Sequence, residues 1–164
     1  MELILIRHAI AVPRGTPGIH DSARPLTPEG ERSFRAAAKG LARMVGRPDA
    51  LLTSPLPRAR RTAEIAAGAW GKIVPQDLPA LASDDFETLQ SSLAAYPEHA
   101  RVALVGHEPN LSSLLARLVG SSTPGPLTFR KGGAALVELQ GRHLKAGTLV
   151  WFLPPKVLRK LGKS

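Results

Sequence analysis

The chain has 164 residues, of which 43% are hydrophobic, and a formal net charge of +9; this length and composition are those of one globular domain. Its apolar runs are far shorter than a membrane span requires, and it has no cysteine, so the sequence excludes a membrane-spanning helix and all disulfide or thiolate chemistry. The excess of positive charge favours anionic partners without specifying the anion, and an arginine-rich soluble surface would explain it equally well.

The first half of the chain alternates segments typical of strands and helices. We expect a strand over residues 2–7, a long loop rich in glycine and proline over 9–26, and a short strand over 51–53. A helix should begin at Thr27-Pro28, because threonine is a good N-cap and proline suits the first helical position, and end at Gly46. A second helix, capped by Ser54-Pro55, should span about residues 55–69.

The second half continues this alternation and ends in an antiparallel pair. We expect a short strand over 72–75, a helix from Asp84-Asp85, a strand over 101–105, a helix from Pro109 to Gly120, a loop over 121–133, and paired strands over 134–139 and 148–153. Strands that alternate with helices predict a three-layer α/β/α fold with a mostly parallel central sheet. We expect a single domain over residues 1–153 and a basic tail over 154–164, whose folding the sequence does not indicate.

Two apolar runs end in a histidine. Arg7-His8 follows residues 3–6, and Gly106-His107 follows residues 102–105. In an open α/β sheet, ligands bind beyond the carboxyl ends of the strands. Arg58 lies near the start of a predicted helix, where guanidinium and free backbone N–H groups both favour a phosphate. A histidine with an unprotonated nitrogen can accept a phosphoryl group, so these residues predict a site for phosphoryl transfer.

Four segments carry a resemblance to a known family. They are, in chain order, LILIRHA over residues 3–9, DSARPLTPEG over 21–30, SPLPRARRT over 54–62 and VGH over 105–107. Together they resemble the histidine phosphatase superfamily, which has the phosphoglycerate mutase-like fold, and more narrowly the short bacterial phosphohistidine phosphatases of the SixA type. The resemblance implies that His8 attacks phosphorus and is transiently phosphorylated, and that Arg7, Arg58 and His107 hold the phosphoryl group. It implies no metal and no other cofactor.

Four further residues are candidates for substrate binding: Ala9, Asp21, Arg24 and Asn110. Ala9 stands where the family usually has glycine, and its methyl group is expected to narrow the pocket slightly. Asp21 and Arg24 could touch substrate, but we favour an ion pair that holds the long loop. Asn110 follows His107 closely, and we give equal weight to a place in the pocket lining and a place outside it. The remaining histidines, His20, His99 and His143, are expected at the surface.

The general acid of larger family members is missing here. They place a glutamate after the second arginine motif, where this chain reads LASDD over residues 81–85. Asp84 or Asp85 could substitute, although both suit a helix N-terminus, which we favour. A very basic alkoxide needs a proton to leave, whereas imidazole, with a pKa near 6.5, needs much less help. A site without a strong acid is therefore better suited to phosphorus–nitrogen bonds.

The expected function is that of a phosphohistidine phosphatase. Its substrate would be a phosphorylated histidine on a phosphocarrier or phosphorelay protein. The N-terminus lacks a signal-peptide layout, and the cytoplasm is the compartment we expect by default. One alternative is a small-molecule phosphomonoesterase of the same superfamily. Another is a non-catalytic module that binds phosphate or nucleic acid, although an aromatic content of 4% leaves few side chains on which bases could stack.

Overall fold

The centre of the computed structural model is a six-stranded sheet with the order β3-β2-β4-β1-β5-β6. The structure describes residues 1–163 except 72, 122, 124, 126, 141–143 and 145. Four strands run parallel: β1 (Glu2–Arg7), β2 (Ala50–Thr53), β3 (Gln76–Asp77) and β4 (Arg101–Gly106). The other two, β5 (Ala134–Glu138) and β6 (Thr148–Leu153), each pair antiparallel with the preceding strand in the sheet. The predicted mostly parallel sheet is confirmed.

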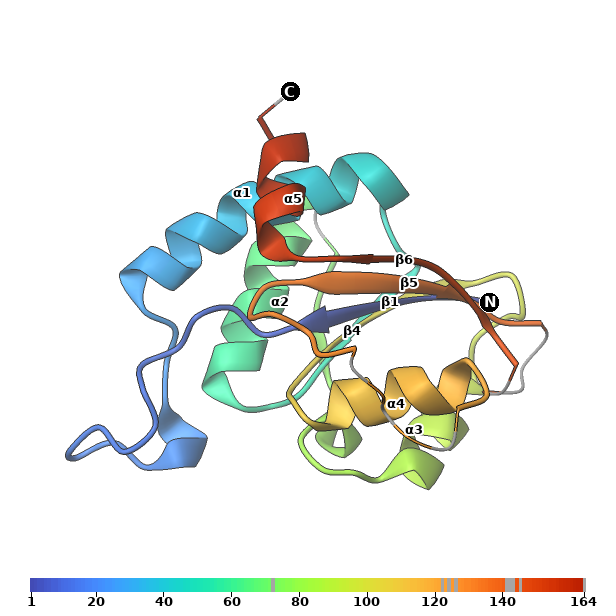
Figure 1. The fold of residues 1–164 in the computed structure, drawn as a ribbon, viewed down its shortest axis with the longest axis horizontal. Coiled ribbons are helices and arrows are strands. Elements are labelled where there is room, and N and C mark those ends of the chain that lie inside the picture. The colour runs from blue at the N-terminus through green and yellow to red at the C-terminus, as the bar shows by residue number, and fades with distance from the viewer. Residues whose placement is uncertain are drawn as a thin grey trace.

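Helices cover both faces of the sheet (Figure 1). One face carries α1 (Pro28–Val45), α2 (Pro57–Ala69) and α5 (Pro155–Leu161), and the other carries α3 (Phe86–Leu93) and α4 (Asn110–Leu118). Successive side chains of a strand point to opposite faces, so Ile4 and Ile6 join the first core cluster while Leu3 and Leu5 join the second. This is the expected three-layer arrangement. None of the helices in the described part of the chain is long and apolar enough to cross a membrane.

The last helix packs closely on the first (Figure 1). The sequence did not indicate whether residues 154–164 fold; in the structure, Leu158 of α5 is fully buried. Glycine makes the contact possible, because a Cβ atom at Gly40 would lie 2.0 Å from the Leu158 carbonyl oxygen. Likewise a Cβ atom at Gly162 would lie 2.2 Å from the carbonyl oxygen of Ala36. The C-terminal segment therefore contributes to the core around α1.

Two expected boundaries are wrong. The second helix begins at Pro57, after an N-cap at Leu56, rather than at residue 55. Ser54 is not its cap: its backbone N–H bonds the Val105 carbonyl of β4, and its hydroxyl contacts His107 and accepts from the Leu56 N–H ahead of the helix. The strand expected over 72–75 is instead Gln76–Asp77, and residue 72 lies outside the described residues. The caps predicted for α1 and α3 are confirmed: the side chains of Thr27 and Asp85 accept hydrogen bonds from the backbone N–H groups of Gly30 and Thr88.

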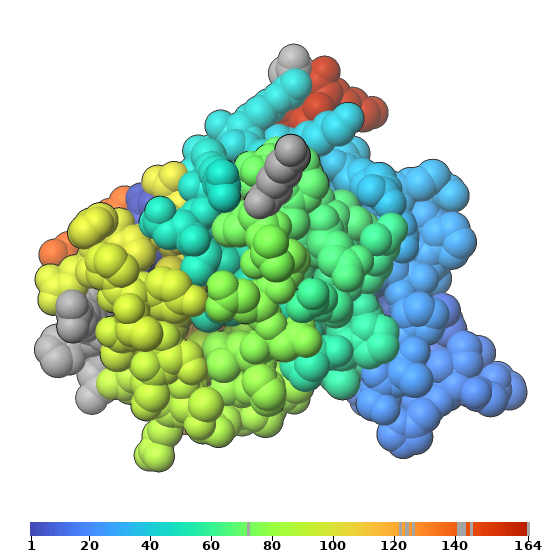
Figure 2. All heavy atoms as spheres, turned by 180° about the vertical axis from the view of Figure 1, so that it is seen from behind, coloured from blue at the N-terminus to red at the C-terminus, as the bar shows by residue number. Residues whose placement is uncertain are grey.

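The long loop between β1 and α1 projects from one corner of the molecule (Figure 2, blue). It contains a single 3-10 turn, Asp21–Ala23, and a bridge between Ala11 and Leu26 closes its base. The loop lies tight against α1, because a Cβ atom at Gly30 would come within 2.1 Å of the Ile10 carbonyl oxygen. The base of the loop is therefore held in place just after His8, while its tip reaches into solvent.

Candidate active site

The ends of two neighbouring parallel strands bring His8 and His107 together. Arg7 pairs with Gly106 in the β1–β4 register, so the next residue of each strand emerges at the same edge of the sheet. The two imidazole rings lie with centroids 5.0 Å apart and planes tilted by 52°. Both are buried, with exposed fractions of 5% for His8 and 8% for His107. The structure thus brings together two histidines that are 99 residues apart in the sequence.

Three arginines surround the histidines. Arg58 lies in the first turn of α2 and donates to the backbone carbonyl of Asp21 at 2.9 Å. Arg7 donates to the Phe129 carbonyl at 2.5 Å. Arg24 is buried in the loop and donates to the Val12 carbonyl at 2.7 Å. Guanidinium groups are positively charged and present several N–H donors, so three of them around the two rings favour an anion in this pocket.

Several donors in this pocket have no partner. Four buried side-chain nitrogen or oxygen atoms of the described residues lack a hydrogen bond, and three of them are Arg7 Nε, Arg58 Nε and His107 Nδ1. An unsatisfied buried donor costs about 1–3 kcal/mol, more when it is charged. Such a cost persists in native proteins where a ligand supplies the missing acceptor. An oxyanion, with its several acceptor oxygens and negative charge, would satisfy these nitrogen atoms.

The environment of His8 leaves one ring nitrogen ready to attack. Its Nδ1 donates to the carbonyl oxygen of Ala9 at 2.7 Å, and since a carbonyl only accepts, Nδ1 carries the proton and Nε2 the lone pair. Burial, together with the charges of His107, Arg58 and Arg7, lowers the pKa of His8 to about 3, although the bond to Ala9 raises it. The ring is neutral at neutral pH, as a nucleophile must be.

His107 is held from the opposite side by Ser54. Its Nε2 lies 2.8 Å from the Ser54 hydroxyl oxygen. Burial and then the charges of Arg58, Arg7 and Arg24 lower the pKa of His107 to about 4, against a smaller opposite effect of Asp21. In the tautomer in which Ser54 donates, Nδ1 carries the proton and can donate to an oxyanion. Ser54 at the end of β2 therefore orients the second imidazole.

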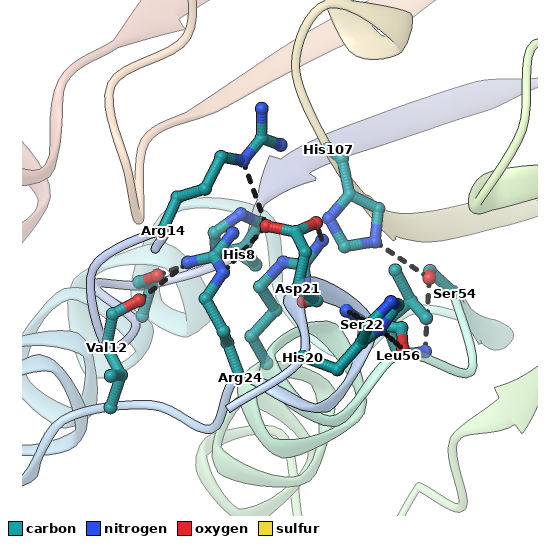
Figure 3. Close-up of polar contacts among 12 residues, drawn as sticks. His8, Val12, Arg14, His20, Asp21, Ser22, Arg24, Ser54, Leu56 and His107 are labelled. Atoms are coloured by element: carbon teal, nitrogen blue, oxygen red, sulfur yellow. Dashed lines mark hydrogen bonds and ion pairs between the residues drawn. The ribbon is translucent and has the colours of Figure 1, made fainter. Parts of the chain in front are cut away.

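Asp21 connects the loop to this pocket (Figure 3). One of its carboxylate oxygens accepts from Arg14 Nε and Arg24 Nε, both at 2.9 Å, and the other lies 3.8 Å from Arg58 NH2. The hydrogen bond from Arg14, followed by that from Arg24, lowers the pKa of Asp21, so the carboxyl group is ionised at neutral pH. The expected ion pair between Asp21 and Arg24 is present.

The structure places the remaining residues named from the sequence in different surroundings. Ala9 is buried, its backbone N–H donates to Thr62 Oγ1 at 3.0 Å, and it is not among the described residues with positive φ, so the backbone does not require glycine there. Asn110 lines a small cleft together with His107, Asp84 and Asp85. Asp85 is the N-cap of α3, as favoured from the sequence. His20 and His99 are exposed as expected, and His143 lies outside the described residues.

Sequence reasoning missed three residues that support the site: Ser54, Thr62 and Glu108. Thr62 also donates to the Arg58 carbonyl at 2.7 Å and so joins the start of α2 to Ala9. Glu108 accepts from the Phe129 N–H at 3.0 Å, next to the carbonyl that Arg7 contacts. Each lies within four residues of a predicted site residue, which was the available signal. Among the residues that the structure describes, no group of three or more acidic or histidine side chains could hold a metal ion.

The chain matches known proteins over nearly all of its length. The model of the histidine phosphatase superfamily (branch 1) matches residues 3–92, which include Arg7, His8 and Arg58. An uncharacterised protein of Picosynechococcus sp. is 37% identical over 154 residues, which are 90% of this chain and 91% of that one. A SixA protein from Agrobacterium tumefaciens is 29% identical with a TM-score of 0.78, over 94% of this chain and 97% of that one.

A second SixA structure, of a protein histidine phosphatase complexed with tungstate, is 26% identical with a TM-score of 0.80, over 96% of this chain and 99% of that one. Tungstate, the ligand of that protein, is an oxyanion. His107 lies beyond residues 3–92, which the family model matches, while the structural similarity covers 96% of the chain. The chain therefore belongs to branch 1 of the histidine phosphatase superfamily, has the activity of a phosphatase, and is similar to SixA proteins.

Proposed function

We propose that this protein is a phosphohistidine phosphatase that removes the phosphoryl group from a histidine of a phosphocarrier or phosphorelay protein in the cytoplasm. His8 is the nucleophile, and Arg7, Arg58 and His107 bind the phosphoryl oxygens. The orphaned nitrogens of these last three residues support the assignment, because they are the donors that a bound phosphoryl group would satisfy.

The reaction takes two displacements at phosphorus. In the first, the lone pair of His8 Nε2 forms a bond to phosphorus while the phosphorus–nitrogen bond of the substrate breaks, and the departing imidazole receives a proton from solvent. In the second, water attacks the phosphoryl-His8 intermediate, His8 recovers its lone pair, and orthophosphate leaves with the remaining water proton passed to solvent. Arg7 and Arg58 stabilise the charge on the equatorial oxygens in both steps.

The observation that carries the choice of substrate is the state of the carboxyl groups around the pocket. The pKa of Asp21 is lowered by its arginine partners, and that of Asp85 is lowered by its hydrogen bonds to Thr88. Glu108 is occupied by the Phe129 N–H and by Ser112. Neither Asp21 nor Asp85 is therefore poised to protonate an alkoxide at neutral pH. Imidazole is the leaving group that such a site can release, because its own second nitrogen takes a proton from solvent.

The charge of the chain and the exposure of the site fit a protein partner. A net charge of +9 attracts an acidic surface over long range and raises the association rate. Asp21 and Arg14, which border the pocket, have side chains that are 40% and 80% exposed, so a folded partner can approach this edge. The partner is accordingly expected to be a small acidic protein that carries its phosphohistidine on an accessible surface.

The test compares turnover on phosphohistidine and on phosphate esters. The ratio of kcat/KM for a phosphohistidine protein or peptide to that for sugar phosphates is measured at neutral pH, with the His8→Gln variant as the inactive control. The proposal predicts a strong preference for phosphohistidine, by about a hundredfold or more. A preference for sugar phosphates would instead assign the small-molecule phosphomonoesterase activity.

A further inference from the structure

Glu108 directly follows His107 in the chain and takes no part in the mechanism proposed above. Its carboxylate accepts a hydrogen bond from the backbone N–H of Phe129 at 3.0 Å. Its two oxygens also lie 2.9 and 2.8 Å from the hydroxyl oxygen of Ser112, a buried residue of α4. The carboxylate is therefore fixed to α4 and joins this helix to the segment that contains Phe129.

Phe129 needs this acceptor because it lies outside the helices and strands of the fold. The residue is 1% exposed, and its ring packs edge-on against Phe152 with 4.7 Å between the centroids. A buried backbone N–H without a partner is costly, and here the carboxylate of Glu108 takes the place that a neighbouring strand usually has. The position of Phe129 thus depends on Phe152 at its ring and on Glu108 at its N–H.

The carbonyl group of Phe129 in turn holds Arg7. Arg7 Nη1 donates to this carbonyl at 2.5 Å, whereas Arg7 Nε is buried without a partner. A guanidinium group is planar, so a fixed Nη1 restricts the directions in which Nε can point. Burial lowers the pKa of Arg7, and the charge of Glu108 opposes this shift, as expected for two groups that lie near each other. The direction of the free N–H therefore depends on the Phe129 carbonyl, and through it on Glu108.

We propose that Glu108 is a positioning residue, which directs Arg7 toward the phosphoryl group through the backbone of Phe129. The inference rests on the role of Arg7 in the proposed function and adds to it the group that orients this arginine. Glu108 touches neither the substrate nor the reacting atoms. Its contribution is geometric, so it requires an acceptor oxygen at the right reach and does not require a negative charge.

The experiment separates reach from charge with three substitutions of Glu108. Glu108→Gln keeps an acceptor oxygen at the same reach without the charge, Glu108→Asp keeps the charge on a shorter side chain, and Glu108→Ala removes both. The measured quantity is kcat/KM for p-nitrophenyl phosphate, so the result does not depend on selectivity for phosphohistidine, and circular dichroism checks that each variant is folded. Glu87→Ala is the matched control, because Glu87 is an exposed carboxylate of α3, on the same face of the sheet as α4.

Glu108→Gln should retain kcat/KM within about threefold, whereas Glu108→Asp and Glu108→Ala should lose about tenfold or more, because a small displacement of a group that binds the transition state is enough to slow the reaction. Glu87→Ala should behave as the parent does. Parental activity in folded Glu108→Asp, or a loss in Glu108→Gln as large as that in Glu108→Ala, would overturn the proposal, since the charge or a proton of Glu108 would then matter instead of its reach.

A double-mutant cycle tests whether the effect passes through Arg7. Arg7→Ala alone should lower kcat/KM by about a hundredfold or more. In that background Glu108→Asp should lower it by less than about a further twofold, because the group that Glu108 positions is gone. The full loss in the Arg7→Ala background would mean that Glu108 acts elsewhere, for example on His107, and would overturn the proposal. Parental activity of Arg7→Ala would instead refute the role of Arg7 in the proposed function.

Discussion

The two buried histidines should make the protein strongly sensitive to mild acid. Both are neutral when folded, since burial lowers the pKa of His8 to about 3 and that of His107 to about 4, from 6.5 in the unfolded chain. Below pH 6.5 the unfolded chain binds protons that the folded protein does not, so stability falls as the pH falls toward the folded values. This loss of stability disappears fully only at pH values above 6.5, the pKa of the histidines in the unfolded chain.

The structure allows the magnitude to be worked out. At about pH 5 each histidine is almost fully protonated when unfolded and almost fully neutral when folded, so the free energy of unfolding should change by about 2.5 kcal/mol per pH unit. Integrated from about pH 7 to about pH 5, the two histidines together remove about 3–4 kcal/mol. The His8→Gln variant should lose about half of this dependence, because glutamine does not titrate.

The assay is urea unfolding followed by circular dichroism at a series of pH values in phosphate-free buffer, because a bound oxyanion would change the pKa values. His99→Gln is the matched control, since His99 is exposed and should leave the pH dependence as it is. A change of less than about 1 kcal/mol in the parent over this range would refute the reasoning, as would an unaltered dependence in His8→Gln. Either result would mean that the imidazoles are not held neutral by burial among arginines.

Three other substitutions, and a matched control for the last of them, test the remaining parts of the account. Arg58→Ala should lower kcat/KM by about a hundredfold or more and weaken inhibition by tungstate, because a charge-assisted contact to the phosphoryl group is lost; unchanged inhibition would speak against its role. Ser54→Ala should lower kcat by about tenfold with little change in KM, because His107 loses its orienting partner. Gly40→Ala should cost about 1–3 kcal/mol of unfolding free energy through its clash with α5. Gly68→Ala, with nothing within 4 Å of the new Cβ atom, should be neutral or stabilising by up to about 1 kcal/mol.

The main outline of the site could be predicted because strand ends are well marked in this sequence. Two apolar runs stop abruptly at Arg7-His8 and at Gly106-His107, and pairing of parallel strands brings such ends to one edge. The role of Ser54 was not predictable in this way. Serine before proline is a typical helix cap, but here the backbone N–H of Ser54, the residue after β2, still bonds the Val105 carbonyl of β4, and its hydroxyl contacts His107.

Contacts that depend on how the long loop closes could not be predicted from the sequence either. The turn-forming residues of the loop suggested the ion pair between Asp21 and Arg24. The contact of Asp21 with Arg58, in contrast, spans 37 residues and depends on how the loop folds over α2. The packing of the last helix depends on two close approaches at glycines, which hydrophobic periodicity does not reveal. Strand β3 was misplaced because only two of its residues pair, at an edge where both are exposed.

The most direct test of the central claim is to trap the enzyme during turnover and locate the phosphate. The enzyme is mixed with a labelled phosphohistidine substrate, quenched within milliseconds in alkali, in which phosphohistidine survives, and mapped by mass spectrometry. The account predicts label on His8 in the parent protein, a normal amount in His99→Gln and none in His8→Gln. Label on His107 or on any other residue, or turnover without a phosphorylated enzyme, would contradict it.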